Sequence, residues 1–276
     1  MKTLKKIPAH VTLALGALAS APALAGAPAL SGLVGQADDA ESAFSAPAAM
    51  SRLEGSNWTV QTMIASSMAD FEIDEELTEV EGGNPNKGDD PILIPSIYHV
   101  RQLNEDWHAG FSVTVPSGFG SDYGGQWAGR YQTVDFSLVY IALTPAVSYR
   151  LTDKFSLGAS LGINYTSETS EVKIPQPDRE GDGKITSDLD GVGVNITLSM
   201  FYEFTDRTRG GISWTSDTDA DLEGNVRLRD LGPVFGRVAE EKGLTDINTE
   251  ITNTLPQRVI AGMYHEFESG RYVTLD

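Results

Sequence analysis

The stretch GVGVNITLSMFYEF (residues 191–204) carries two unlike faces. Apolar side chains alternate along it with small or polar ones, and a period of two is typical of a β-strand, in which successive side chains point to opposite sides. One face holds Val192, Val194, Ile196, Leu198, Met200, Tyr202 and Phe204, and the other holds Gly193, Asn195, Thr197, Ser199, Phe201 and Glu203. The fold therefore depends on whether the apolar face contacts a protein core or lipid.

The same alternation recurs along the chain, for example in KFSLGASLGINYT (154–166) and in residues 139–150. No helical period is sustained over a comparable length. The patterns predict an all-β fold with strands at about 57–71, 92–103, 107–118, 133–151, 154–174, 191–205, 208–217 and 256–268, and another beginning at Tyr272.

The connections between these strands alternate in length. Short turns are expected at 104–106, 152–153, 206–207 and 268–271, and long connections at 72–91, 119–132, 175–190 and 218–255. Outer-membrane barrels show this alternation, because tight turns lie on the periplasmic side and long loops on the outside. A soluble β-sandwich is the alternative, but it has no reason to alternate its connections. The sequence predicts an antiparallel transmembrane β-barrel whose apolar face contacts lipid.

The N-terminus has the features of a secretory signal peptide over residues 1–25. Lys2, Lys5 and Lys6 precede an apolar run, and Ala23-Leu24-Ala25 forms an A-x-A cleavage site. We therefore expect export to the outer membrane of a Gram-negative cell. Residues 26–56 lack a strand period but contain Phe44, Met50 and Leu53, which favours a plug or hatch inside the barrel. Residues 57–276 would supply the barrel strands.

Composition excludes several functions. The formal net charge of −19 disfavours nucleic acid, which proteins bind largely through Lys and Arg. The chain contains no Cys, so disulfides and metal–thiolate chemistry are excluded. Only His99, His108 and His265 follow the leader, and no Ser–His pair with an orienting partner is visible in the sequence, so we expect no enzyme, no catalytic residue and no cofactor.

Five segments in order resemble one known family. They are ADDAESAFSAPAAMSRLEG (37–55), VPSGFGSDYGGQWAGRY (115–131), LTPAVSYRLTDKFSLGASLGINY (143–165), TRGGISW (208–214) and LPQRVIAGMYH (255–265). From about residue 33 to its end, the chain resembles the FadL-type outer-membrane transporters of long-chain fatty acids and other hydrophobic compounds.

This resemblance implies a fourteen-stranded barrel closed by an N-terminal hatch, of which about eight strands and part of a ninth are present here. The chain is therefore expected to be a C-terminally incomplete copy, and the complete protein a monomer inserted by the barrel-assembly machinery. Its function would be passive uptake of a hydrophobic ligand, a fatty acid or a hydrocarbon. A general diffusion porin or a surface-interaction barrel (an adhesin or receptor) is the alternative. Expected partners are the ligand, outer-membrane lipid and lipopolysaccharide.

The resemblance also assigns candidate sites. The hatch motif of the family, Asn-Pro-Ala, corresponds to Ala46-Pro47-Ala48, so the Asn is missing and Pro47 remains. The lateral exit of the family lies at a kink in the third strand, which corresponds to Pro116, Ser117, Gly118 and Gly120. Pro and Gly weaken strand pairing, although an ordinary strand end before a long loop would read the same. We expect Ala46-Pro47-Ala48 to pack against this kink.

Two further segments leave alternatives open. Phe119, Tyr123, Trp127 and Tyr131 could line a ligand-capture groove or form an interfacial aromatic girdle. DREGDGKITSD (178–188) resembles an EF-hand loop, but Leu189 stands where the bidentate Glu would be required. We therefore interpret it as an acidic surface loop and expect no metal site.

Overall fold

The computed structural model describes residues 33–66, 71–74, 76–86, 92–176 and 180–275. The predicted signal peptide, residues 26–32 of the predicted hatch and Asp178 lie outside these ranges.

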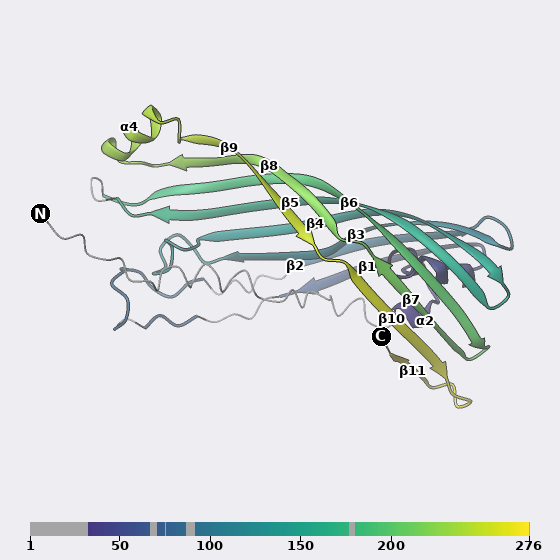
Figure 1. Cartoon of the computed structure of the whole chain (residues 1–276). Helices are drawn as coiled ribbons and strands as arrows, with labels where there is room; N and C mark the ends of the chain where they lie inside the picture. Colours follow the sequence, from purple (N-terminus) through teal and green to yellow (C-terminus); the bar gives the residue numbers. More distant parts are fainter. Residues whose placement is uncertain (1–32, 67–70, 75, 87–91, 177–179, 276) are drawn as a thin grey trace, which may run out of the picture.

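One antiparallel sheet makes up most of the described chain and curls into a half-barrel (Figure 1). Its strands are β1 (Ser56–Ala65), β2 (Ile92–Gln102), β3 (Trp107–Asp122), β4 (Asp135–Thr152), β5 (Phe155–Ile174), β6 (Gly183–Thr205), β7 (Thr208–Thr215), β8 (Thr218–Arg229), β9 (Asp246–Leu255), β10 (Arg258–Glu266) and β11 (Tyr272–Leu275). The main path is β1-β2-β3-β4-β5-β6-β7-β10-β11, and β8 pairs with β6 and β9. The predicted all-β barrel architecture is confirmed as this curled antiparallel sheet.

The apolar face of the strands is the exposed face. In β6, Val194 is 59% exposed, whereas Thr197 and Ser199 on the opposite face are each 5% exposed. Leu157, Leu161 and Ile163 of β5 are exposed in the same way. A soluble sheet buries such side chains, but the outer surface of a membrane barrel presents them to lipid. The small polar side chains line the concave interior.

The two ends of the sheet differ as predicted. Short turns gather at one end: 103–106, 153–154, 206–207 and 267–271. The longer connections, which include residues 123–134 and 230–245, gather at the other. By analogy with barrels of this kind, the first end is periplasmic and the second is external. The helix α4 (Pro233–Glu241) belongs to the external end (Figure 1).

Several predicted boundaries are wrong. β6 begins at Gly183 rather than 191, β3 continues to Asp122, and the predicted connection 218–255 contains the strands β8 and β9. In β8 the polarity of the two faces is reversed, since Leu222 is buried on the inside and Asp219 and Asp221 are exposed on the outside. These outward carboxylates place this part of the wall above the lipid, where an apolar outer face is not required.

β8 and β9 extend two strands that are already in the wall. β7 and β8 are separated only by residues 216–217, and β9 and β10 only by residues 256–257. β7 pairs with β10, and β8 pairs with β9. The chain therefore crosses this part of the wall as two long, interrupted strands.

The N-terminal segment lies inside the curve, near the end with the short turns (Figure 1). It consists of α2 (Leu33–Gln36), α3 (Ser42–Ser45) and η2 (Pro47–Arg52), and most of its residues are buried. We call residues 33–55 the hatch. Among the described residues, none of the helices combines the length and apolar character needed to cross a bilayer.

Candidate functional site

The hatch contacts the wall at positions occupied by glycine, which has no side chain. A Cβ added to Gly158 of β5 would overlap the backbone of Pro47 and Ala48, and a Cβ added to Gly110 of β3 would lie 2.7 Å from Met50 Sδ. Close approach of two backbones requires glycine. Next to Gly158, the backbone N–H of Ala48 donates to Ser199 Oγ at 2.7 Å. The predicted hatch motif Ala46-Pro47-Ala48 thus packs against β5 and β6.

Arginine side chains fasten the hatch at the periplasmic end. Arg150 of β4 donates to the carbonyl of Ser51, and Arg209 Nε donates to the carbonyl of Gln36 at 2.9 Å. Arg209 also lies over the ring of Tyr264, 3.7 Å from its centroid. Arg52 of the hatch forms an ion pair of 2.9 Å with Glu203. The hatch is therefore held by several directed contacts as well as by apolar packing.

One residue of β6 explains an exception in the sequence pattern. Phe201 is the single large apolar side chain on the polar face of the opening stretch, and it is 2% exposed. It packs against Val34, Ala46 and Ala48 of the hatch. This interruption of the polar face was a signal for hatch docking that the sequence analysis did not use.

β3 is irregular at Pro116, but it does not end there. Thr114 pairs with Ala142 and Ser117 pairs with Tyr140, so two residues of β3 face only Ile141 of β4. This is a β-bulge, which bends a strand and increases its twist. Pairing continues beyond it through Gly118 and Gly120 to Asp122.

The wall opens on the other side of the bulge. β2 pairs with β3 only as far as Ile97 and Val113, whereas β2 continues to pair with β1 up to Ile92 and Ala65. From Thr114 onward, β3 therefore lacks β2 as a neighbour. The predicted kink residues Pro116 and Ser117 lie at the start of this divergence.

An interior cavity of about 340 Å³ reaches the bulge. Phe44 of the hatch lines it together with Pro116 and Ser117, whereas Ala46-Pro47-Ala48, which the sequence analysis expects at the kink, does not line it. The remaining lining residues are Thr144, Asn164, Asn195, Thr197, Thr215, Ser216, Thr218, Leu255, Pro256, Gln257 and Arg258. The cavity combines an apolar part near the hatch and bulge with hydroxyl, amide and guanidinium groups.

Two cavity residues lack partners that buried polar groups normally have. Asn164 is 4% exposed, and its Nδ2 donates no hydrogen bond in the described part of the chain. The half-buried Arg258 guanidinium has no ion pair there either, and no Asp or Glu lines the cavity. A buried cation usually has a partner. Sequence reasoning missed both residues, because each is one polar residue among many on the inner face.

The predicted aromatic set does not form one group. Phe119 is 60% exposed on β3, with its ring centroid 6.0 Å from that of Phe136. Tyr123 and Trp127 contact each other at 5.1 Å in the loop that follows. Trp127 and Tyr131 line an external hollow of about 320 Å³ with Ile73 and Val80 from the first loop, and also Thr78, Ala128, Gly129 and Gln132.

An aromatic girdle is present elsewhere, at the periplasmic edge. Trp107 and Tyr149 lie 4.7 Å apart, and Tyr202 contacts Phe155 and Phe204. Trp and Tyr are enriched at such interfaces.

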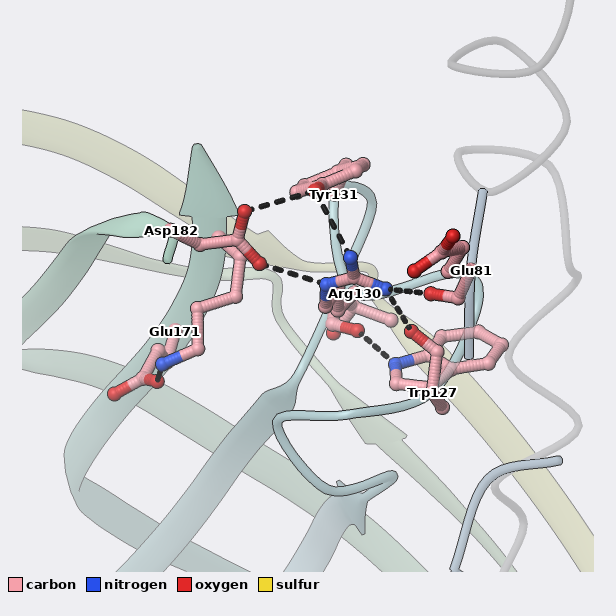
Figure 2. Close-up of polar contacts among 8 residues, drawn as sticks. Glu81, Trp127, Arg130, Tyr131, Glu171 and Asp182 are labelled. Atoms are coloured by element: carbon pink, nitrogen blue, oxygen red, sulfur yellow. Dashed lines mark hydrogen bonds and ion pairs between the residues drawn. The ribbon is translucent and has the colours of Figure 1, made fainter. Parts of the chain in front are cut away.

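A polar cluster joins the external loops around Arg130 (Figure 2). Arg130 Nε lies 2.7 Å from Asp182 Oδ2, its Nη1 donates to the carbonyl of Glu81, and Tyr131 Oη donates to Asp182 Oδ1 at 2.8 Å. Burial by itself raises the pKa of Asp182, but the hydrogen bonds from Arg130 and Tyr131 hold that pKa below its ordinary value. Three segments far apart in sequence are thereby fixed together.

This cluster uses the carboxylate that an EF-hand would need. Asp182 binds Arg130, and from Gly183 onward the chain is strand rather than calcium loop. Among the described residues, no group of three or more His, Asp or Glu is placed to hold a metal ion.

A Ser–His pair does occur on the outer surface. Ser56 Oγ lies 3.1 Å from His99 Nε2, and the His99 ring centroid lies 4.2 Å from that of Trp58. A catalytic pair also needs a group that orients the base. The described neighbours of this ring are aromatic, and no carboxylate is hydrogen-bonded to it.

The family model for outer membrane protein transport proteins (OMPP1/FadL/TodX) matches residues 9–273. The chain belongs to this family. A FadL homologue of Pseudomonas aeruginosa superposes with a TM-score of 0.69 at 20% identity, over 87% of this chain and 64% of that protein. The Ralstonia pickettii toluene transporter TbuX superposes with a TM-score of 0.60 at 19% identity, over 85% of this chain and 65% of that protein. The Pseudomonas putida toluene transporter TodX superposes with a TM-score of 0.55 at 20% identity, over 83% of this chain and 62% of that protein.

These likenesses concern the fold, and the chain spans slightly less than two thirds of each of the three structures. None of the curated proteins compared with the chain is similar to it. The family consists of outer membrane transport proteins, so the predicted FadL-type membership is confirmed.

Proposed function

We propose that this protein carries hydrophobic small molecules passively across the outer membrane, with long-chain fatty acids favoured and aromatic or alkane hydrocarbons next. One observation supports the proposal above all. The cavity is lined by Phe44 of the hatch and by Pro116 and Ser117 of the bulge, so one space adjoins both the plug and the place where β3 leaves β2.

Arg258 favours a fatty acid over a hydrocarbon. Its guanidinium lies at a cavity without acidic residues, and the amide of Asn164 supplies a free donor. A carboxylate in the cavity would pair with the Arg258 guanidinium, because charge-assisted hydrogen bonds to Arg are among the strongest in proteins. Toluene or an alkane would leave both donors unpaired.

Lateral exit follows from the chemistry of an apolar ligand. Each methylene moved into water costs about 0.8 kcal/mol, so a long acyl chain meets a high barrier if it must leave through the periplasm. A path from the cavity past Pro116 into lipid avoids water. Backbone groups exposed at the bulge are tolerated because they face a protein-lined space.

The same proposal includes export through residues 1–25 and a monomeric barrel inserted by the barrel-assembly machinery, with lipid and lipopolysaccharide as its surroundings. No cofactor or enzymatic step is required.

Uptake by a Gram-negative strain that lacks its own transporter tests this function. We expect labelled oleate to enter cells that carry this gene faster than cells that carry an empty vector. Arg258→Gln should slow oleate uptake more than toluene uptake, because only the carboxylate loses its partner. Steady ion conductance of the purified protein without hydrophobic uptake would instead support a diffusion porin. Surface binding without uptake would support an interaction barrel.

A further inference from the structure

The external half of the wall folds across the interior. β6 changes its neighbour along its length, from β7 at Thr197–Thr205 to β8 at Lys184–Asp190. A Cβ added to Gly191 or Gly193 of β6 would overlap backbone atoms of β8, and one added to Gly224 would overlap β6. The glycines therefore permit a sharp corner between these two strands.

This corner brings β9 to a strand that is not its neighbour in the sheet. Tyr140 Oη of β4 donates to Asn253 Oδ1 of β9 at 2.8 Å, although β5, β6 and β8 separate the two strands along the sheet. Tyr140 is 4% exposed. Leu189, Ala220 and Leu222 fill the inside of the corner. The β8–β9 hairpin thus lies over the interior, and one described side-chain hydrogen bond joins it to β4.

The contact lies directly above the cavity. Along β4, Thr144 of the cavity lining is four residues below Tyr140 toward the periplasm, and along β9, Leu255 is two residues below Asn253. The base of the hairpin is formed by residues 216–217 and 256–257. These residues pair neither in the β7–β10 ladder nor in the β8–β9 ladder. Thr218 and Leu255 at the base of the hairpin therefore line the cavity on its external side, and Phe44 of the hatch lines it on the periplasmic side.

We propose that the Tyr140–Asn253 contact is the external gate of the cavity, which a ligand arriving from the outer loops must open. This inference rests on the proposed transport function, because it assigns a control point to the same cavity. A single neutral hydrogen bond contributes little net free energy, so thermal motion or an arriving ligand can break it while the β8–β9 ladder stays intact.

Tyr140 also places this gate next to the opening in the wall. It is the β4 partner of Ser117, the first residue paired after the bulge in β3. Tyr140 therefore belongs both to the contact with Asn253 and to the part of β4 that pairs with β3 at the lateral opening.

Thiol labelling tests the gate without any knowledge of the ligand. The natural chain has no Cys, so Thr144→Cys places one thiol in the cavity lining. In this background, Tyr140→Phe or Asn253→Ala should raise the rate of labelling by an external apolar maleimide about two- to tenfold, as expected for loss of one hydrogen bond. Thr252→Val is the matched control, because it removes a hydrogen bond of 2.7 Å to Asp221 on the outward face of the same hairpin. Its labelling rate should not change.

Locking the hairpin tests the same gate in the opposite direction. Tyr140→Cys with Asn253→Cys, joined by a bifunctional methanethiosulfonate reagent, should reduce oleate uptake at least tenfold, and a reductant should restore it. Asp219→Cys with Thr254→Cys, which are paired on the outward face, should show no such loss.

The proposed gate is wrong if the labelling rate of Tyr140→Phe is unchanged in correctly assembled protein, or if the labelling rate of Thr252→Val rises equally. It is also wrong if the protein with the locked pair still imports oleate at the rate of the unlocked protein. Labelling that responds as expected, in a protein that imports neither oleate nor toluene, would support the gate and refute the transport function.

Discussion

Two of the interruptions in the described part of the wall differ from each other. In β3, one extra residue at Val115–Pro116 shifts the register against β4, and β2 diverges at the same height. At residues 216–217 and 256–257, both strands lose pairing together, and Thr215–Arg258 and Thr218–Leu255 keep one register across the gap. The first interruption separates neighbours and opens the wall, whereas the second bends a pair of strands that stay together.

The difference shows that a breaker residue does not by itself determine what happens to a sheet. Pro116 and Pro256 both lack the N–H that a ladder requires. Their effects differ because β2 leaves β3, whereas β7–β8 follows β9–β10 through the bend. Whether a proline opens the wall or only bends it therefore depends on whether the neighbouring strand follows the bend.

The largest effect is expected from closing the opening in β3. Pro116→Val with Gly118→Val restores a donor and β-propensity, and a Cβ at Gly118 would lie 3.5 Å from Leu138 O, which is ordinary contact. If four methylenes must then enter water at about 0.8 kcal/mol each, uptake of oleate falls about 200-fold. Uptake assays in cells would measure this loss, with heat-modifiability as the check on assembly.

Pro145→Val is the matched control for that variant, because Pro145 of β4 pairs with Phe111 of β3 in a part of the ladder without a register shift. Its uptake should equal that of the natural protein. A Pro116→Val/Gly118→Val variant that assembles and transports at the natural rate would show that ligands leave through the hatch instead.

A second large effect is expected at the hatch. Gly158→Val would place a branched side chain in the backbone of Pro47 and Ala48 and disrupt the hydrogen bond from Ala48 to Ser199. Overpacking and the lost bond together should weaken hatch docking by about 3–4 kcal/mol. Ion conductance of the purified protein should rise as the interior opens. Gly120→Ala, where a Cβ finds its nearest neighbour at 3.6 Å, should conduct like the natural protein.

The sequence predicted the strands in the lipid-facing belt because lipid imposes a simple rule on them. Val192, Val194 and Ile196 must be apolar outside, so the period of two is visible. Above the belt the rule changes: β8 points Ala220 and Leu222 inward and Asp219 outward, so it lacks an apolar outer face and its sequence predicts a loop. The candidate cavity was harder to predict, because Phe44, Asn164 and Arg258 come from distant segments that only the curl of the sheet brings together.

A moderate, pH-dependent effect is expected in the hatch. Burial, followed by the charges of Asp39 and Asp38, raises the pKa of Glu41 from 4.5 to about 7. The docked hatch therefore binds a proton more tightly than the undocked one. Its stability is greatest below pH 4.5 and falls as the pH rises through 7, by on the order of 2 kcal/mol.

Hydrogen exchange of residues 42–46, corrected for the intrinsic effect of pH, would measure this change between pH 5 and 8. Glu41→Gln should remove the pH dependence, and the exposed Glu54→Gln should retain it. Equal profiles for the natural protein and Glu41→Gln would show that Glu41 does not control docking.

The smallest effect is expected at the second interruption, and it completes the comparison. Pro256→Val returns an N–H to β9–β10 opposite residues 216–217, as Pro116→Val does in β3. Here no extra residue has to be removed, since Leu255 and Arg258 already share one register with Thr218 and Thr215. One added ladder bond contributes about 0.5–1.5 kcal/mol, and the bend is also imposed by Gly191, Gly193 and Gly224 of the β6–β8 corner. The unfolding midpoint in detergent should rise slightly, and oleate uptake should stay within about twofold of the natural rate. A loss of uptake as large as that of Pro116→Val/Gly118→Val would mean that the second interruption is also a passage through the wall. The distinction between an opening at β3 and a bend at residues 216–217 and 256–257 would then be wrong.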